Sequence, residues 1–107
     1  MSLIIQIAQL NFLVGGIEQN ARRVIEAARA ARSQAQVILF PELALTGYPP
    51  EDLLLRDDFI QRVEQALEQV LAQAQGIHLV LGYPRREGGR LYNVAGVLRD
   101  GQILAEY

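Results

Sequence analysis

The segment Val37-Ile38-Leu39-Phe40-Pro41-Glu42 decides the fold of this chain. Its first four residues form an apolar run typical of a buried strand, and Pro41 ends that strand because it has no backbone N–H to donate to a sheet. Upstream, apolar residues recur at three- and four-residue steps from Ile17, which predicts an amphipathic helix ending near residues 32–35. Residues 3–8 are again apolar and predict another buried strand. Strand, helix and strand in this order predict two parallel strands joined by a crossover helix.

The rest of the chain predicts a second helix and a strand meander. The helix starts at Asp57 or Asp58, where Asp58 and Gln61 fit a capping box, and its apolar stripe runs to residue 74. Strands are expected at residues 77–82, 91–98 and 102–107. Residues 85–90 would connect the first two, and Asp100-Gly101 is a strong two-residue hairpin signal. We therefore expect an α/β fold, a mixed sheet with two helices that leave one sheet face uncovered.

Composition excludes several kinds of chemistry. The 107 residues have a formal net charge of −2, which argues against a nucleic-acid partner. The chain has no Cys, one His and no Lys, since all ten basic residues are Arg. Disulfides, thiolate nucleophiles and Schiff bases are therefore impossible within it. We expect no metal site, and we expect His78 to be a core or sheet-face histidine. No apolar run approaches the ~18 residues of a spanning helix, so we expect a cytoplasmic protein with no membrane partner.

Glu42 is the strongest candidate for chemistry. It follows a buried strand directly, and open α/β sheets place their ligands at the carboxyl ends of such strands. Its apolar neighbours suit it to proton transfer, although a structural carboxylate that accepts backbone N–H bonds is the alternative. Tyr48 could orient Glu42 or face a ligand. Asn93, a polar residue in an apolar strand, could hydrogen-bond the loop of Glu42 or pair within a bulge.

A longer stretch around Glu42 carries a family resemblance. Residues 40–48, FPELALTGY, resemble the nitrilase (carbon–nitrogen hydrolase) superfamily, which uses a Glu, a Lys and a Cys as its triad. The continuation PPEDLLLR, residues 49–56, is similar to the glutaminase domains of the glutamine-dependent NAD⁺ synthetase family. Further matches are AQLN at 8–11, LGYP at 81–84, YN at 92–93 and DGQIL at 100–104.

The resemblance implies that residues 1–107 are the N-terminal portion of a nitrilase-like α-β-β-α sandwich. The rest of that glutaminase domain and an ATP- and Mg²⁺-dependent synthetase domain would lie outside the chain. Only Glu42, as general base, transfers from the triad, because the Lys and Cys are implied beyond Tyr107. The parent would hydrolyse glutamine and use the ammonia to amidate nicotinic acid adenine dinucleotide to NAD⁺. This segment would need no cofactor and would be inactive alone, with glutamine, the remaining chain and further copies of itself as partners.

Two other readings remain open. The chain could belong to a stand-alone amidase or carbamoylase of the same superfamily, although the 49–56 loop argues against that. It could also be a non-catalytic α/β binding module. Such a module of the flavodoxin type predicts a fully parallel sheet, whereas the Asp100-Gly101 hairpin predicts antiparallel pairing at the C-terminal end.

Overall fold

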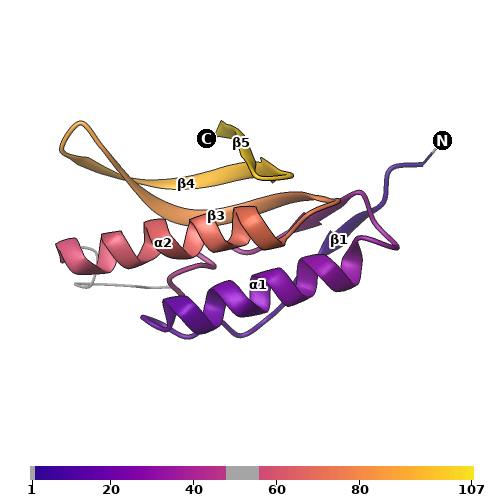
Figure 1. Ribbon diagram of the computed structural model, residues 1–107, viewed down its shortest axis with the longest axis horizontal. Helices are drawn as coiled ribbons and strands as arrows, with labels where there is room; N and C mark the ends of the chain where they lie inside the picture. The colour runs from indigo at the N-terminus through magenta and orange to yellow at the C-terminus, as the bar shows by residue number, and fades with distance from the viewer. Residues whose placement is uncertain (1, 48–55) are drawn as a thin grey trace.

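The computed structural model describes residues 2–47 and 56–107 (Figure 1). Along the chain the elements are β1 (Ile5–Ile7), α1 (Ile17–Ala31), β2 (Val37–Leu39), α2 (Asp57–Gln73), β3 (His78–Glu87), β4 (Arg90–Arg99) and β5 (Gln102–Glu106). This is the order that the sequence predicts.

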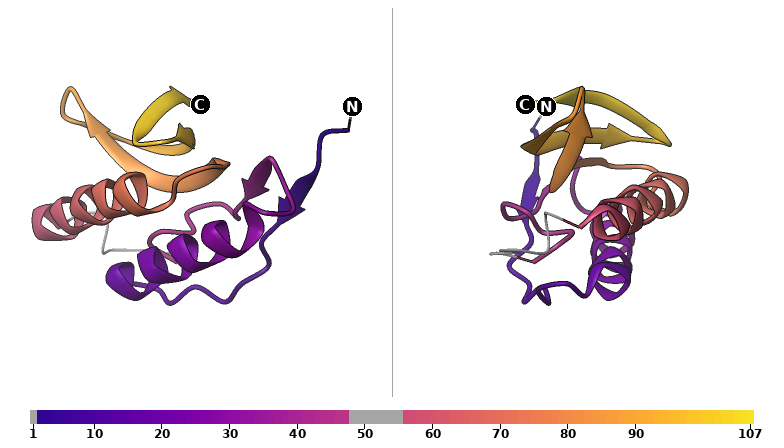
Figure 2. Two further views of the ribbon diagram at one scale, coloured as in Figure 1. Left: turned by 45° about the vertical axis from the view of Figure 1, so that its right-hand side comes forward. Right: turned by 90° about the vertical axis from the view of Figure 1, so that its left-hand side faces the viewer.

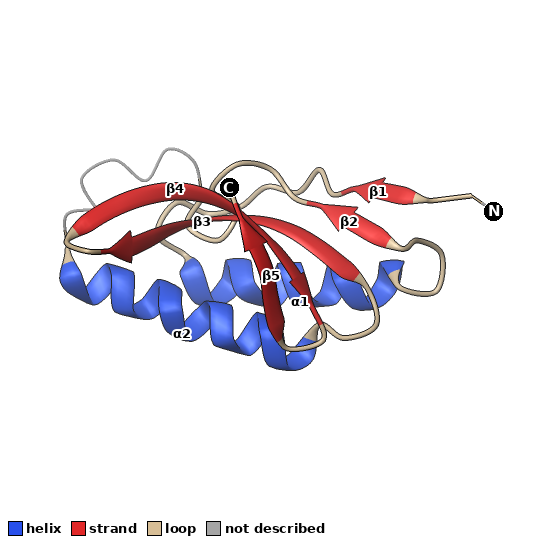
Figure 3. Ribbon diagram, turned by 90° about the horizontal axis from the view of Figure 1, so that it is seen from above, coloured by secondary structure: helices blue, strands red, loops and turns tan. Residues whose placement is uncertain are grey.

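The five strands form one mixed sheet in the order β1-β2-β3-β4-β5 (Figure 3). β1 pairs with β2 and β2 pairs with β3 in parallel, whereas β3 with β4 and β4 with β5 are antiparallel. The mixed sheet is therefore confirmed, and the fully parallel sheet of a flavodoxin-type module is wrong. The carboxyl ends of β2 and β3 meet at the same edge as the beginning of β4.

Both helices pack on the same side of the sheet (Figure 2). Their apolar faces and the facing side chains of the strands make one core. Its largest fully buried members are Tyr83, Phe59, Ile17, Ile38, Leu45, Ile77, Leu79, Leu81 and Leu98. In the described part of the chain no helix lies on the opposite sheet face. The expectation that one face is left uncovered is therefore met.

The first strand is less buried than expected. β1 lies at the edge of the sheet, and Ile5 and Ile7 are 53% and 64% exposed. Leu39 of the neighbouring β2 is 37% exposed. These side chains alternate with Ile38, which is buried in the core under the helices, so they belong to the face that the helices leave open.

The second hairpin is confirmed and the first is tighter than predicted. Asp100 and Gly101 have φ of +46° and +85°, the left-handed pair that a two-residue turn between twisted strands requires. β3 continues to Glu87 and β4 begins at Arg90, so that the connection is only Gly88-Gly89. The predicted strand end at residue 82 and the predicted connection over residues 85–90 are therefore wrong, because β3 continues through Pro84, which lies opposite Asn93 in the β3–β4 ladder.

The predicted capping box of the second helix is wrong. α2 has Arg56 at its N-cap position, and no side chain caps the helix there. Asp57 instead pairs with Arg86 of β3 across 2.6 Å. Two acidic residues in the first turn still complement the positive end of the helix dipole.

Candidate functional site

Glu42 lies in a turn that rises from the carboxyl edge of the parallel strands. The N–H of Phe40 still donates to the carbonyl oxygen of Val80 in β3, at 2.9 Å. Beyond Pro41 and Glu42 the chain returns, and the Leu45 N–H donates to the carbonyl oxygen of Gly82 at 3.2 Å. Residues 41–44 therefore form an arch that is tied to β3 at both ends, and Glu42 is exposed on it.

The arch has a left-handed residue directly after the carboxylate. Leu43 has φ of +50°, which is uncommon for a residue with a side chain and usually marks a turn or a strained functional site. Its side chain is buried, and its carbonyl oxygen accepts bonds from the Thr46 N–H and hydroxyl at 3.1 Å and 3.2 Å. Burial and hydrogen bonds thus hold Leu43 in this conformation.

Asn93 of β4 contacts the carboxylate itself. Its Nδ2 donates to Oε1 of Glu42 at 2.6 Å. The sequence left open whether Asn93 bonds the Glu42 loop or pairs within a bulge, and the structure selects the first. Because this amide engages one carboxylate oxygen, the Glu42 side chain is oriented, and no other described residue binds Oε2.

Two open hollows flank Glu42. One of about 330 Å³ is lined by the Glu42–Asn93 pair together with Gly82 and Ala95. The other, of about 230 Å³, extends from Glu42 toward Asn11, Phe12 and Gly47. Most of the lining side chains are apolar, so a small polar group bound there would meet the Glu42 carboxylate in a largely apolar setting. A separate hollow of about 400 Å³ between α2 and β3 does not include Glu42.

Asn20 supports the arch from below, a role that the sequence analysis did not assign. This residue of α1 is fully buried. Its side chain accepts from the Leu13 N–H at 2.8 Å and donates to the carbonyl oxygens of Leu13 at 2.7 Å and Leu45 at 3.2 Å. It therefore ties the loop after β1 to the end of the arch. The signal that could have found it is a polar residue among the apolar positions of an amphipathic helix.

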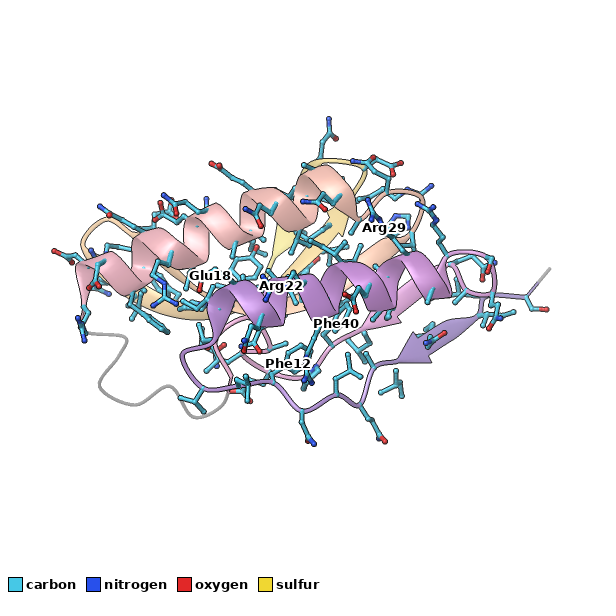
Figure 4. The ribbon with its side chains drawn as sticks, turned by 60° about the horizontal axis from the view of Figure 1, so that its bottom comes forward. Phe12, Glu18, Arg22, Arg29 and Phe40 are labelled. Carbon is cyan, nitrogen blue, oxygen red and sulfur yellow. The ribbon has the colours of Figure 1, made fainter. Side chains whose placement is uncertain are left out.

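An aromatic contact joins the same two segments. The rings of Phe12 and Phe40 pack edge to face with their centroids 6.4 Å apart, beside α1 (Figure 4). Such a pair contributes roughly 0.5–1.5 kcal/mol beyond the area it buries. The loop after β1 and the strand that leads into Glu42 are thus packed together on the α1 side.

Two charged contacts stabilise the scaffold away from Glu42. Glu18 of α1 and Arg62 of α2 are joined at 2.7 Å, and the hydrogen bond from Arg62 lowers the pKa of Glu18. The buried Tyr83 hydroxyl donates to Glu106 of β5 at 2.6 Å. Burial, and then the bond to Glu106, raises the pKa of Tyr83 well above its ordinary value.

His78, a further candidate within the described residues, does not join this cluster. Tyr48 and the 49–55 loop lie outside the described residues. His78 is half-buried in β3, with Nδ1 3.3 Å from a guanidinium nitrogen of Arg99. Within residues 2–47 and 56–107, no three His or acidic residues are grouped as a metal site. No helix in those ranges is long and apolar enough to cross a bilayer.

The fold and this edge of the sheet define an α/β protein with a strand-end carboxylate as its candidate reactive group. The family follows from comparison with known proteins: the carbon-nitrogen hydrolase family matches residues 4–107, and the chain belongs to it.

Relatives that match nearly the whole chain carry the name glutamine-dependent NAD(+) synthetase. The chain is 50% identical over 108 residues to the glutamine-dependent NAD(+) synthetase of Xanthomonas campestris, covering 99% of this chain and 20% of that protein. The structure of an Acinetobacter baumannii enzyme of that name superposes with a TM-score of 0.91 at 38% identity, over 96% of this chain and 20% of the other. An amidase from Nesterenkonia sp. AN1 superposes with 0.81 at 26% identity, over 99% and 43% of the two chains. The chain thus spans about a fifth of the length of the synthetases.

Proposed function

We propose that residues 1–107 are the N-terminal portion of a glutaminase domain in a glutamine-dependent NAD⁺ synthetase. The observation that carries the proposal is the exposed Glu42 carboxylate, bonded to Asn93 at 2.6 Å at the edge where α/β sheets place ligands. The 50% identity to the glutamine-dependent NAD(+) synthetase of Xanthomonas campestris supports a synthetase as the parent protein, in preference to a stand-alone amidase.

In this proposal Glu42 is the general base. It takes the proton of a Cys thiol, and the thiolate attacks the side-chain amide carbon of glutamine. A Lys stabilises the oxyanion, and Glu42 returns the proton to the departing ammonia. Glu42 then takes a proton from water, which attacks the γ-glutamyl thioester and releases glutamate and the thiol. The 107 residues contain no Lys and no Cys, so this chain alone should not hydrolyse glutamine.

Asn93 and Tyr48 have supporting roles. Asn93 holds one oxygen of Glu42, so that the other oxygen faces the thiol and the substrate. Tyr48 either contacts glutamine or orients Glu42. The cradle for the glutamine side chain comes from the hollows beside Glu42 together with residues outside this chain.

The whole protein would couple this site to a synthetase domain. ATP and Mg²⁺ act there, where the released ammonia amidates nicotinic acid adenine dinucleotide to NAD⁺. We propose that the parent is a cytoplasmic homo-oligomer. The apolar sheet face that carries Ile5, Ile7 and Leu39 is exposed in this chain and would pack against the second sheet of the sandwich.

The test is Glu42→Gln in the full-length protein. Glutamine-dependent NAD⁺ formation should fall about 10²- to 10⁴-fold, the usual contribution of a general base. Formation from added ammonia should be unchanged, because the synthetase step does not use Glu42. Glu26→Gln, a matched change at an exposed residue of α1, should leave both rates unchanged.

Two results would contradict the proposal. Glutamine-dependent turnover near the normal rate in Glu42→Gln would show that Glu42 is not the base. A wild-type protein that hydrolyses simple amides but forms no NAD⁺ from either glutamine or ammonia would indicate the stand-alone amidase instead.

A further inference from the structure

Gly82 lies directly against the arch that carries Glu42. A β-carbon added at Gly82 would collide with the backbone nitrogen of Leu43 and would lie 3.0 Å from the carbonyl oxygen of Pro41 and 3.1 Å from the carbonyl carbon of Glu42. All three atoms belong to the main chain, so no side-chain rotation can relieve the contacts. Any residue other than glycine would force the arch itself to move.

The hydrogen bonds between the arch and β3 hold the arch close to the strand. Its two hydrogen bonds, from Phe40 and Leu45, reach carbonyl groups only two residues apart on β3, those of Val80 and Gly82. Residues 41–44 must therefore fold outward between these anchors. The left-handed conformation of Leu43, with φ of +50°, allows the chain to turn back within this interval.

The arch is also held on its far side. The Gly15 N–H donates to the carbonyl oxygen of Thr46 at 2.9 Å, and the Thr46 side chain is fully buried. Asn20 binds the Leu45 carbonyl oxygen. The arch cannot slide along the sheet without breaking these bonds, so a group inserted at Gly82 would lift it away from β3.

Gly82 and Asn93 belong to the same face of the sheet. In the β3–β4 ladder Gly82 is opposite Ala95, and Pro84 is opposite Asn93. Residues two apart on a strand, and residues opposite each other on neighbouring strands, share a face. The distance from the arch to this face therefore sets the distance from Glu42 to Asn93.

We propose that Gly82 is a positioning residue: its missing β-carbon lets the arch lie against β3 and brings the Glu42 carboxylate to Asn93. The consequence for catalysis rests on the proposed function, whereas the geometric part does not. A base held about 1 Å from its productive position can lose about 10²-fold in rate. The glycine would thus matter for turnover although it touches neither substrate nor proton.

The primary test is Gly82→Ala in the full-length protein, with Gly96→Ala as control. Gly96 is in β4, where an added β-carbon would collide with the Tyr83 ring and hydroxyl and with no part of the arch. Both variants should unfold more easily than wild type. Only Gly82→Ala should lower kcat with glutamine, by about 10²-fold, while KM for glutamine and the ammonia-dependent rate stay near normal. Its crystal structure should show Glu42 out of hydrogen-bond reach of Asn93.

A second variant moves the arch without touching β3. Leu43→Ile keeps the side-chain volume, but a β-branched residue is strongly disfavoured at φ of +50°. It should lower kcat in the same way, whereas unbranched Leu43→Met should remain near wild type. This pair tests the arch even where Gly82→Ala yields too little folded protein.

The outcomes separate the inference from the proposed function. If Gly82→Ala and Leu43→Ile keep both the Glu42–Asn93 hydrogen bond and normal kcat, the inference is wrong. Equal losses of kcat in Gly82→Ala and Gly96→Ala would also overturn it, because general weakening of the sheet would then be the cause. If Glu42→Gln stays active, the proposed function fails, and the crystal structure of Gly82→Ala still decides whether Gly82 places the carboxylate.

Discussion

The side chain of Asn93 reaches the carboxylate of Glu42 at 2.6 Å, although 51 residues separate them along the chain. β3 lies between their segments: β2 ends just before Glu42 and pairs with β3 in parallel, and β4 pairs with β3 in the opposite direction. The first half of β4 therefore returns to the edge at which β2 ends. Asn93 of the antiparallel strand β4 thus supplies a hydrogen bond to the carboxylate that follows the parallel strand β2.

Asn93→Ala should reduce glutamine-dependent turnover of the full-length protein by roughly tenfold to a hundredfold. A hydrogen bond to a charged group contributes about 1.5–3 kcal/mol, and the exposure of this pair places it at the lower end. Asn93→Asp keeps the size but sets a second carboxylate against Glu42, so its loss should be larger. Steady-state kinetics with glutamine measure both effects, and kinetics with ammonia provide the control. Normal glutamine kinetics in both variants would show that this hydrogen bond does not orient the base.

The sequence predicted where these residues lie but left open whether they meet. Glu42 stands out because Pro41 ends an apolar run, and Asn93 stands out as a polar residue in a strand. Their contact depends on the registers of two strand pairs, which single-strand patterns do not contain. The burial of β1 was predicted wrongly for a related reason, since an apolar run does not reveal which sheet face the helices cover.

The sequence around Gly82 contains a signal for its role, namely its position as a single glycine within a predicted strand. An isolated glycine within a strand often marks a bulge or the close approach of another backbone. In LGYP, residues 81–84, the glycine drew notice only as part of a family resemblance. The left-handed turn at Leu43 had no such signal, because leucine has no preference for that conformation and tertiary packing imposes it.

Asn20→Ala should lower the free energy of unfolding by about 2–4 kcal/mol. Three hydrogen bonds are lost, and the buried carbonyl oxygen of Leu45 is left without this partner. Urea unfolding of the full-length protein measures the change. Asn11→Ala, at an exposed position in the loop between β1 and α1, should stay within about 0.5 kcal/mol of wild type. Equal stabilities of Asn20→Ala and wild type would mean that water replaces the amide at no cost.

The Tyr83 hydroxyl should make the folded state sensitive to high pH. Burial and the bond to Glu106 raise the pKa of Tyr83 above its ordinary value of 10.0. The folded chain therefore keeps this proton at pH values where the unfolded chain has lost it. Stability from this group is fully present below pH 10.0 and falls as pH rises toward the folded-state pKa, by up to about 1.4 kcal/mol per pH unit.

Tyr83→Phe isolates this contribution. At neutral pH it should cost about 1.5–3 kcal/mol, since a hydrogen bond to a carboxylate is lost. Above pH 10.0 the stability of the variant should fall less steeply than that of wild type. Phenylalanine has no hydroxyl proton, so position 83 no longer binds more protons in the folded state than in the unfolded state. Tyr92→Phe, which removes an exposed hydroxyl of β4, is the matched control and should follow wild type. Denaturant midpoints from pH 8 to about 11 measure the three proteins together, and parallel curves for wild type and Tyr83→Phe would contradict the burial of this proton.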